Sequence, residues 1–263
     1  MQRTFLIVAL AVATSTSTTA HAGSVGDMGL SADQIRSLNA QLTAPVVAPG
    51  IAFGSPVAYG ADWGQLFAGV GGQTLPAGSG DSVDGSMLVG MGFGDSQVTA
   101  GLELSATVIS ITDDFGADGS FNAKMHRALP GRASVALGVE ETQGWGLAET
   151  TQPSIYAVYT QTIDLVPQSP RRPVPLVFNV GAGDERFVDP GEGGVGLFAS
   201  VSVHPHRQLA LIADYTGRGL NAAVSIVPLR RTPLVVTLGA VNLTGRLGGD
   251  VEFAGGIGLL HQF

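Results

Sequence analysis

Residues 257–263 read Ile-Gly-Leu-Leu-His-Gln-Phe, a segment of largely alternating apolar side chains that closes on Phe263. Alternation with a period of two predicts a β-strand whose two faces meet different surroundings. Eleven further stretches with the same period lie between residues 63 and 243. Their typical length of about 10 residues is enough for a tilted strand to cross a bilayer. The sequence therefore predicts an all-β fold of about twelve strands.

The expected strands cover residues 63–72, 85–94, 97–111, 120–129, 132–141, 154–165, 175–183, 194–204, 208–216, 220–228, 233–243 and 250–263. On each, one face carries mainly Val, Leu, Met, Phe and Ala, and the other mainly Gly, Ser, Thr and Asn. A soluble β-sandwich would place more Lys and Glu on its second face. Small uncharged residues are better suited to the crowded lumen of a barrel whose outer face is apolar.

The N-terminus has the pattern of a secretory signal. Gln2 and Arg3 give a weakly basic start, residues 5–12 form a short apolar run, and residues 20–22 give an A-x-A cleavage site. An apolar run of this length is too short to span a bilayer, and the pattern is typical of a cleaved signal. We expect residues 1–22 to be a signal peptide, with a buried N-terminal helix as the alternative.

Residues 23–49 differ from the rest of the chain because their apolar positions follow helical spacing. Residues 31–34 have capping-box spacing, and the apolar residues that follow at helical intervals are Ile35, Leu38 and Leu42. We expect a short helix over about residues 32–42, in the periplasm or folded into the barrel mouth; a disordered leader is the alternative. The predicted organisation is signal peptide 1–22, N-terminal periplasmic segment 23–49 and barrel 50–263.

Composition excludes several classes of function. Charged residues make up 13% of the chain, whereas soluble domains typically contain about 25%. The net charge of −8 argues against nucleic acid as a partner. With no cysteine, the exported chain has no disulfide, no thiolate metal site and no Cys nucleophile.

Polar residues with hydrogen-bonding or charged groups occur on the predicted inner face. Inside a narrow barrel such groups have to pair with one another or stay hydrated. They could line a pore and set its selectivity, or form a network that blocks it, and the sequence leaves both open. The candidate lumen-lining residues are Glu103, Lys124, His126, Glu140, Asp214, Asn221 and Glu252.

The connections between the strands sort into two classes. If the N-terminus is periplasmic, every other connection faces outward and should be longer. Most follow this rule, but residues 216–219 are short where length is expected, and residues 166–174 are long where a turn is expected. Acidic residues gather in the long loops, for example at 184–192, where a solvated face is favoured over a cation site.

No catalytic constellation is recognisable. The chain has no G-x-S-x-G motif and no segment like the His-Asp-Ser-Asn-Gly stretch of outer-membrane phospholipases. We therefore expect a protein that is not an enzyme, with no catalytic residues, no metal and no cofactor. Two alternatives stay open: a lipid- or lipopolysaccharide-modifying barrel enzyme, and a secreted soluble β-sandwich that binds a ligand.

The signal pattern, the absence of cysteine and the terminal strand together resemble bacterial outer-membrane β-barrel proteins. The resemblance implies an antiparallel up-and-down transmembrane barrel in the cell outer membrane of a Gram-negative envelope, with membrane lipid as partner. It also implies that Leu259, His261 and Phe263 form the signal read by the barrel-insertion machinery, although His261 stands where an aromatic residue is common.

Residues 211–221 further resemble a hairpin of barrels associated with exopolysaccharide secretion. The function implied is a porin-like pore, or a structural or accessory component of envelope or polysaccharide export. Small solutes or polysaccharide are then the candidate cargo.

Overall fold

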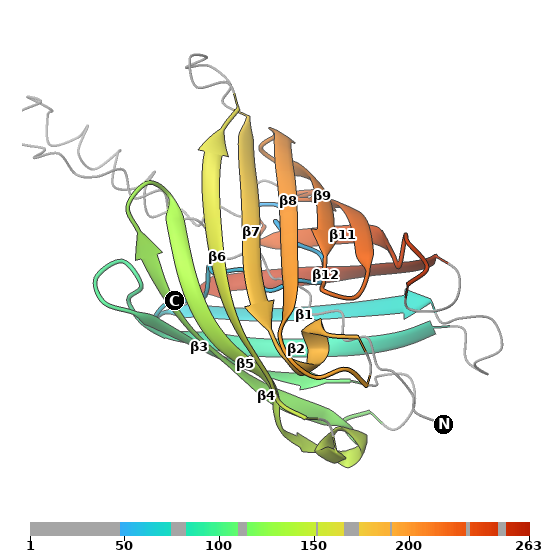
Figure 1. The fold of residues 1–263 in the computed structure, drawn as a ribbon. Helices are drawn as coiled ribbons and strands as arrows, with labels where there is room; N and C mark the ends of the chain where they lie inside the picture. Colours follow the sequence, from blue (N-terminus) through green and yellow to red (C-terminus); the bar gives the residue numbers. More distant parts are fainter. Residues whose placement is uncertain are drawn as a thin grey trace, which may run out of the picture.

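In the computed structural model, the strands form a closed antiparallel barrel (Figure 1). The structure describes residues 48–74, 83–109, 115–150, 152–165, 174–189, 191–229, 232–246 and 251–263. Each strand pairs with its neighbours in the chain, and β1 also pairs with β12 to close the ring. The all-β, twelve-stranded, up-and-down barrel predicted from the sequence is thus confirmed. The expected signal peptide and the helix near residues 32–42 lie outside the described residues.

The strands are β1 (Gln65–Thr74), β2 (Val83–Gly94), β3 (Gly101–Val108), β4 (Gly119–Leu129), β5 (Ala133–Trp145), β6 (Ser154–Asp164), β7 (Pro175–Gly183), β8 (Gly196–His206), β9 (Leu209–Tyr215), β10 (Leu220–Ile226), β11 (Leu234–Val241) and β12 (Glu252–Gln262). Two short 3₁₀ helices, η2 (Gly146–Thr150) and η3 (Glu185–Phe187), follow β5 and β7. Within the described ranges, no helix has the length and apolar character needed to cross a membrane.

One strand is clearly shorter than its alternation predicts. The apolar pattern favours a strand from residue 97, but β3 begins at Gly101. The cause is Asp95, whose carboxylate accepts hydrogen bonds from the main-chain N–H groups of Gln97 (2.8 Å) and Val98 (3.2 Å). This side chain holds the connection as a turn, so the backbone groups of residues 97 and 98 are used locally.

Each strand turns at least one large apolar side chain to the outside. In β5, for example, exposed Val135 and Leu137 alternate with buried Ala136 and Gly138. The most exposed examples within strands are Ile155, Leu197, Leu238 and Phe253, at 60–68% of full exposure. A continuous apolar belt of this kind is rare on soluble monomers and typical of barrels surrounded by lipid.

The two ends of the barrel differ. We call the end that carries Phe263 and the β2–β3 and β4–β5 connections the turn end, and the opposite end the loop end. At the loop end, the β9–β10 turn is short, and the β7–β8 connection folds over it. Arg218 donates to the main-chain oxygens of Glu185 and Val188, and a Cβ on Gly217 would lie 2.2 Å from the oxygen of Phe187.

The last residue is fixed at the turn end of the β1–β12 seam. The N–H of Phe263 donates to the oxygen of Gly64 (2.9 Å), and its ring lies 6.2 Å from that of Trp63. Leu259 and His261 are exposed on the same outer face, opposite Ala68 and Leu66 of β1. This geometry does not test the role of these residues as an insertion signal, which stays a prediction.

We expect deletion of Phe263 to lower the amount of folded barrel, because it removes the ring contact with Trp63 and a hydrogen bond at the seam. The measurement is the electrophoretic mobility of boiled and unboiled membrane extracts. Phe263→Tyr keeps the ring and serves as the control, with near-normal amounts expected. Equal folded bands for the deletion and the control would contradict the prediction.

Candidate functional site

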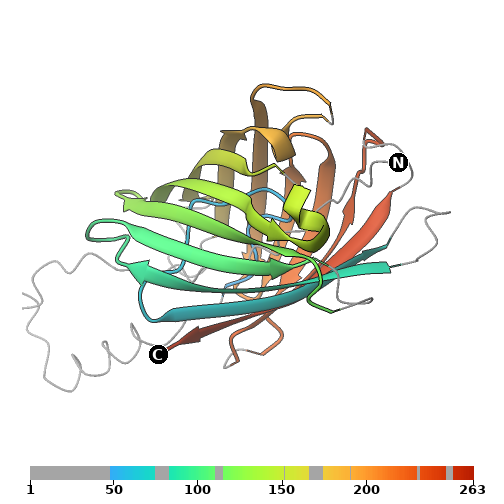
Figure 2. The same ribbon diagram turned by 90° about the horizontal axis from the view of Figure 1, so that it is seen from below.

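The lumen is crossed by the chain itself. Residues 48–62, here called the plug segment, precede β1 and lie between the walls of the barrel, where they are drawn in blue (Figures 1 and 2). Pro49, Phe53, Ala58 and Ala61 are all at most 3% exposed. The segment makes contacts from Ser225 near the turn end to Asp214 near the loop end, and then back to Ser96 at the turn end. It therefore makes a hairpin-like excursion that enters and leaves at the turn end.

Asp214 of β9 holds the apex of this excursion. One carboxylate oxygen, Oδ2, accepts hydrogen bonds from the N–H of Phe53 (3.2 Å), the N–H of Ser55 (3.2 Å) and the hydroxyl of Ser55 (2.6 Å). Asp214 is only 1% exposed. A buried carboxylate is costly unless it is hydrogen-bonded, so these three donors explain how the charge is tolerated.

The ring of Phe53 occupies an apolar pocket in the wall beside Asp214. The pocket is formed by buried residues of β9 to β12, namely Ala210, Ile212, Ala223, Val241 and Ala254. The wall has space for the ring because position 239 is glycine. A Cβ on Gly239 would lie 2.6 Å from the Phe53 ring. Polar contacts and apolar packing thus act together at the apex of the plug segment.

A cap from the loop end meets the apex. Arg186, in η3, forms an ion pair with Glu140 of β5 and donates to the main-chain oxygen of Gly54. The next residue, Phe187, is fully buried, and its ring stacks on that of Phe198 with the centroids 4.5 Å apart. The cap and the plug segment therefore approach each other from opposite ends of the barrel and touch through Arg186.

The returning limb of the plug segment is held first at Ala58. Its N–H donates to the hydroxyl oxygen of Thr160 (2.8 Å), and its carbonyl accepts from the hydroxyl of Ser134 (3.0 Å). Thr160 is in turn linked through Asn179 to Ser200, so the hydrogen bonds continue across three strands of the wall. Such a connected polar network is rigid when all its members are satisfied.

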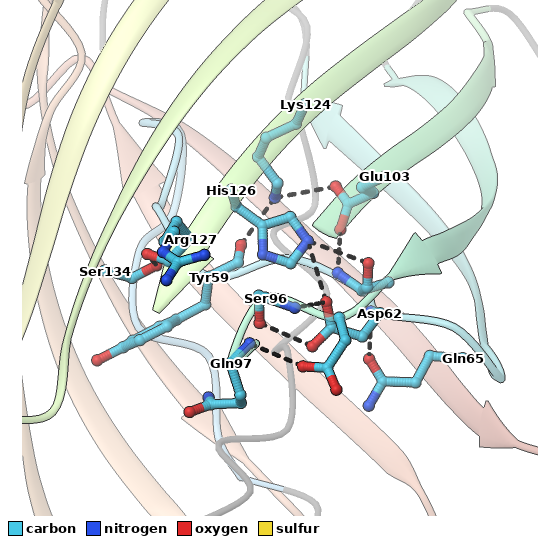
Figure 3. Close-up of polar contacts among 12 residues, drawn as sticks. Tyr59, Asp62, Gln65, Ser96, Gln97, Glu103, Lys124, His126, Arg127 and Ser134 are labelled. Carbon is cyan, nitrogen blue, oxygen red and sulfur yellow. Dashed lines mark hydrogen bonds and ion pairs between the residues drawn. The ribbon is translucent and has the colours of Figure 1, made fainter. Parts of the chain in front are cut away.

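The limb is held next by charged side chains of β3 and β4 (Figure 3). Lys124 forms an ion pair with Glu103 (2.9 Å) and donates to the oxygen of Tyr59 (2.8 Å). Glu103 also accepts the N–H of Ala61 (2.8 Å), and a ring nitrogen of His126 lies 3.1 Å from the oxygen of Ala61. Both charges are thus compensated by one another and by the plug segment.

The limb ends at Asp62, beside the turn between β2 and β3. Asp62 accepts hydrogen bonds from the N–H (2.9 Å) and the hydroxyl (2.7 Å) of Ser96. The wall approaches closely here because it carries glycine: a Cβ on Gly92 would lie 2.3 Å from the backbone of Ala61, and one on Gly101 would lie 2.3 Å from Asp62. Only glycine permits so close an approach.

The structure brings six of the seven candidate lumen residues to the plug segment or its cap. Asp214, Glu103, Lys124 and His126 contact the segment directly, and Glu140 acts through Arg186. Asn221 is buried beside Gly54 and accepts a hydrogen bond from the N–H of Asn242 (3.1 Å). Glu252 lies near the loop end of the seam and accepts a hydrogen bond from Gln73.

Sequence reasoning missed the partners of these residues. The sequence pattern did not identify Phe53, Ser55, Arg186 or Ser225. Phe53 and Ser55 lie in the plug segment, which has neither alternation nor helical spacing. One feature of the sequence indicates that further partners are needed inside the barrel. The inward-facing charged residues do not have enough opposite charges on neighbouring strands. In the described part of the chain, no three His, Asp or Glu side chains come together as a metal site would require.

Comparisons with known proteins add little to this geometry. No family model and no curated protein matches the chain. Among solved structures, it is similar to the N-terminal β-barrel domain of Pseudomonas aeruginosa OprF, with 12% identity and a TM-score of 0.20 over 75% of this chain and 97% of that one. At this TM-score the similarity carries no weight for function, and the barrel is established by its own strand pairing.

We expect Asp214→Ala to loosen the plug segment, because three donors lose their common acceptor. A lost buried hydrogen-bond partner costs about 1–3 kcal/mol, which corresponds to roughly 5- to 150-fold in accessibility. The measurement is the rate at which a thiol reagent labels Val57→Cys, a buried position in a chain that has no other cysteine.

The matched control is Asp164→Ala, which removes a carboxylate paired with Arg132 at the turn end and far from the apex. Labelling of Val57→Cys should be unchanged in that background. Gly193→Cys, in an open part of the β7–β8 connection, should label quickly in every background. Equal labelling rates at position 57 with and without Asp214 would refute the assignment.

Proposed function

We propose that this chain is an outer-membrane β-barrel whose lumen is closed by its own N-terminal plug segment. It then acts as a structural or gated barrel, and an open pore forms only when the segment is displaced. The observation that carries this proposal is the binding of the plug segment's main chain by inward-facing side chains. Five of its N–H groups and four of its carbonyls are bound in this way.

The apolar belt supports membrane embedding. Exposed Val, Leu, Ile and Phe side chains occur on all twelve strands and alternate with buried small and polar ones. A lipid environment removes that belt from water, whereas in a soluble protein it would promote aggregation. The outer membrane as location, its lipid as partner and the insertion machinery as the route are supported by the sequence resemblance described above.

A role in polysaccharide export is a finer proposal with narrower support. It rests on the resemblance of residues 211–221 to a hairpin of secretion-associated barrels. In the structure these residues cover most of β9, the turn and the first two residues of β10, and they supply Asp214 and Asn221 to the apex site. The stretch that carries the resemblance is therefore also a stretch that contacts the plug segment.

We expect deletion of residues 48–61 to convert a closed barrel into a conducting one. The reason is that the deleted residues fill the path between the two ends, whereas the strands begin only at Gln65. Purified protein is reconstituted in planar bilayers, and single-channel currents are compared with those of the wild type. Only samples with a heat-modifiable band count, so that misfolded protein is not scored.

The full-length Asp214→Ala variant provides a second, milder test of closure. It should show brief openings between the closed wild type and the open deletion. A wild type that already conducts as well as the folded deletion would show that the plug segment does not close the lumen.

Membrane embedding has its own test in Leu137→Arg. On a lipid-facing position near the bilayer middle, Arg should cost about 2–4 kcal/mol, but only about 0–1 kcal/mol near an interface. Val98→Arg, in the β2–β3 turn, is the matched control because Val98 is also apolar and exposed. Denaturant unfolding in lipid vesicles gives both values. Equal and small losses would argue for a barrel that is exposed to water.

A further inference from the structure

We propose that the lumen is a binding channel for an uncharged, extended polypeptide, and that the plug segment occupies it as an intramolecular ligand. This inference rests on the proposed closure of the lumen and adds the chemical class of the occupant. It is carried by the way in which the wall recognises the segment, by an anchor pocket for one ring and by a binding group that the segment leaves unused.

Recognition is directed mainly at the main chain. Side-chain oxygens of Ser225, Asp214, Thr160 and Glu103 accept its N–H groups, and Arg186, Ser134, Lys124 and His126 face its carbonyls. A polypeptide presents one donor and one acceptor in every residue except proline. A wall with both kinds of partner along an extended path is matched to that chemistry. Because main-chain atoms are common to all peptides, this part of the recognition tolerates different sequences.

Specificity comes from a few side chains at the apex. The Phe53 ring is only 3% exposed in its pocket, and the Ser55 hydroxyl reaches Asp214 two residues later. An aromatic residue followed at the second position by a hydroxyl residue is therefore the motif that the site selects. Anchoring by one buried ring within a set of weaker contacts is common in peptide recognition.

The electrostatics favour an uncharged chain. Residues 48–61 contain no charged side chain. Two acidic residues of the wall around them are compensated within the protein, Glu103 by Lys124 and Glu140 by Arg186, and a third, Asp214, accepts uncharged N–H and O–H donors of the segment. A ligand with its own buried charges would have to compete with these pairs and bear the desolvation cost.

The plug segment leaves part of the site unused. The second carboxylate oxygen of Asp214, Oδ1, is buried and has no hydrogen-bond partner within the described residues. A Cβ on Gly54 would lie 3.4 Å from this oxygen. Buried acceptors are normally satisfied, so an unused one beside the occupant indicates that the site can bind a chain with an additional donor there.

The test uses the full chain with the plug segment weakened and the wall intact. In Phe53→Ala/Ser55→Ala, the segment loses its ring anchor and its hydroxyl, while all wall residues are kept. The probe is a fluorescein-labelled synthetic peptide of residues 48–61, which has no charged side chain, and fluorescence anisotropy in detergent reports binding. We expect saturable binding to the variant at least tenfold tighter than to the wild type, whose site is already filled.

Four controls define the site. A peptide with Phe53→Ala and a scrambled peptide should each bind at least tenfold more weakly, and adding Asp214→Ala to the barrel variant should have a similar effect. Dextran, an uncharged polysaccharide, should not displace the peptide. Equal binding to wild type and variant, equal binding of the scrambled peptide, or displacement by dextran would overturn the inference.

The outcomes separate this inference from the closure on which it rests. If deletion of residues 48–61 opens the channel but the peptide does not bind the weakened full-length variant, closure stands and the peptide site is refuted. If the deletion does not conduct while the peptide binds in the expected order, closure fails and the peptide site stands. The anisotropy measurement requires no ion conduction, so each result is decided by its own experiment.

Discussion

Every polar group enclosed by a closed barrel needs a partner inside it, and this constraint organises the molecule. A lumen of about eight strands is just filled by its own side chains, whereas a wider barrel leaves space. Here twelve strands close, and the space is taken by an extended stretch of main chain. The unpaired N–H and carbonyl groups of that stretch and the polar residues of the wall satisfy one another. Without the segment, the polar residues of the wall would have to pair with one another or be hydrated.

The two ends of the barrel contribute differently to this arrangement. From the turn end comes the plug segment, which is covalently continuous with β1. From the loop end comes the cap formed by Arg186 and Phe187, and the ring of Phe187 is buried against Tyr156 and Phe198. Arg186 joins the two because it bonds both to Glu140 of the wall and to Gly54 of the segment. A change in the β7–β8 connection can therefore be transmitted to the apex of the segment through the side chain of Arg186.

The fold was predictable from the sequence because outward-facing and lumen-facing residues alternate with a period of two. Exposed Leu137 and buried Ala136 are neighbours in the chain, and that contrast repeats along β5. Boundaries failed where a side chain competed for backbone groups, as Asp95 does before β3. Inward-facing residues such as Asp214 and Lys124 could be named from the same alternation.

The partners of those residues could not be predicted, because an extended segment without regular structure has no period to detect. Residues 48–62 read as an uncharged linker until Asp62. Phe53 and Ser55 acquire their roles only from residues about 160 positions later in the chain. Likewise, Phe187 in an acidic loop gave no sign that it would become one of the most buried rings. Long-range pairing of this kind is fixed by tertiary structure, not by local propensity.

The position of the plug segment also has a consequence for how the molecule assembles. The bond between Gly50 and Ser225 joins residues 175 positions apart, and the wall of the apex is supplied by β9 to β12. This seat exists only after the last strands have formed, although the segment itself is the first described part of the chain. Contacts so distant in sequence form late because the loops that they close are long. We therefore expect residues 48–62 to dock only once the last strands are in place, although they precede every strand in the chain.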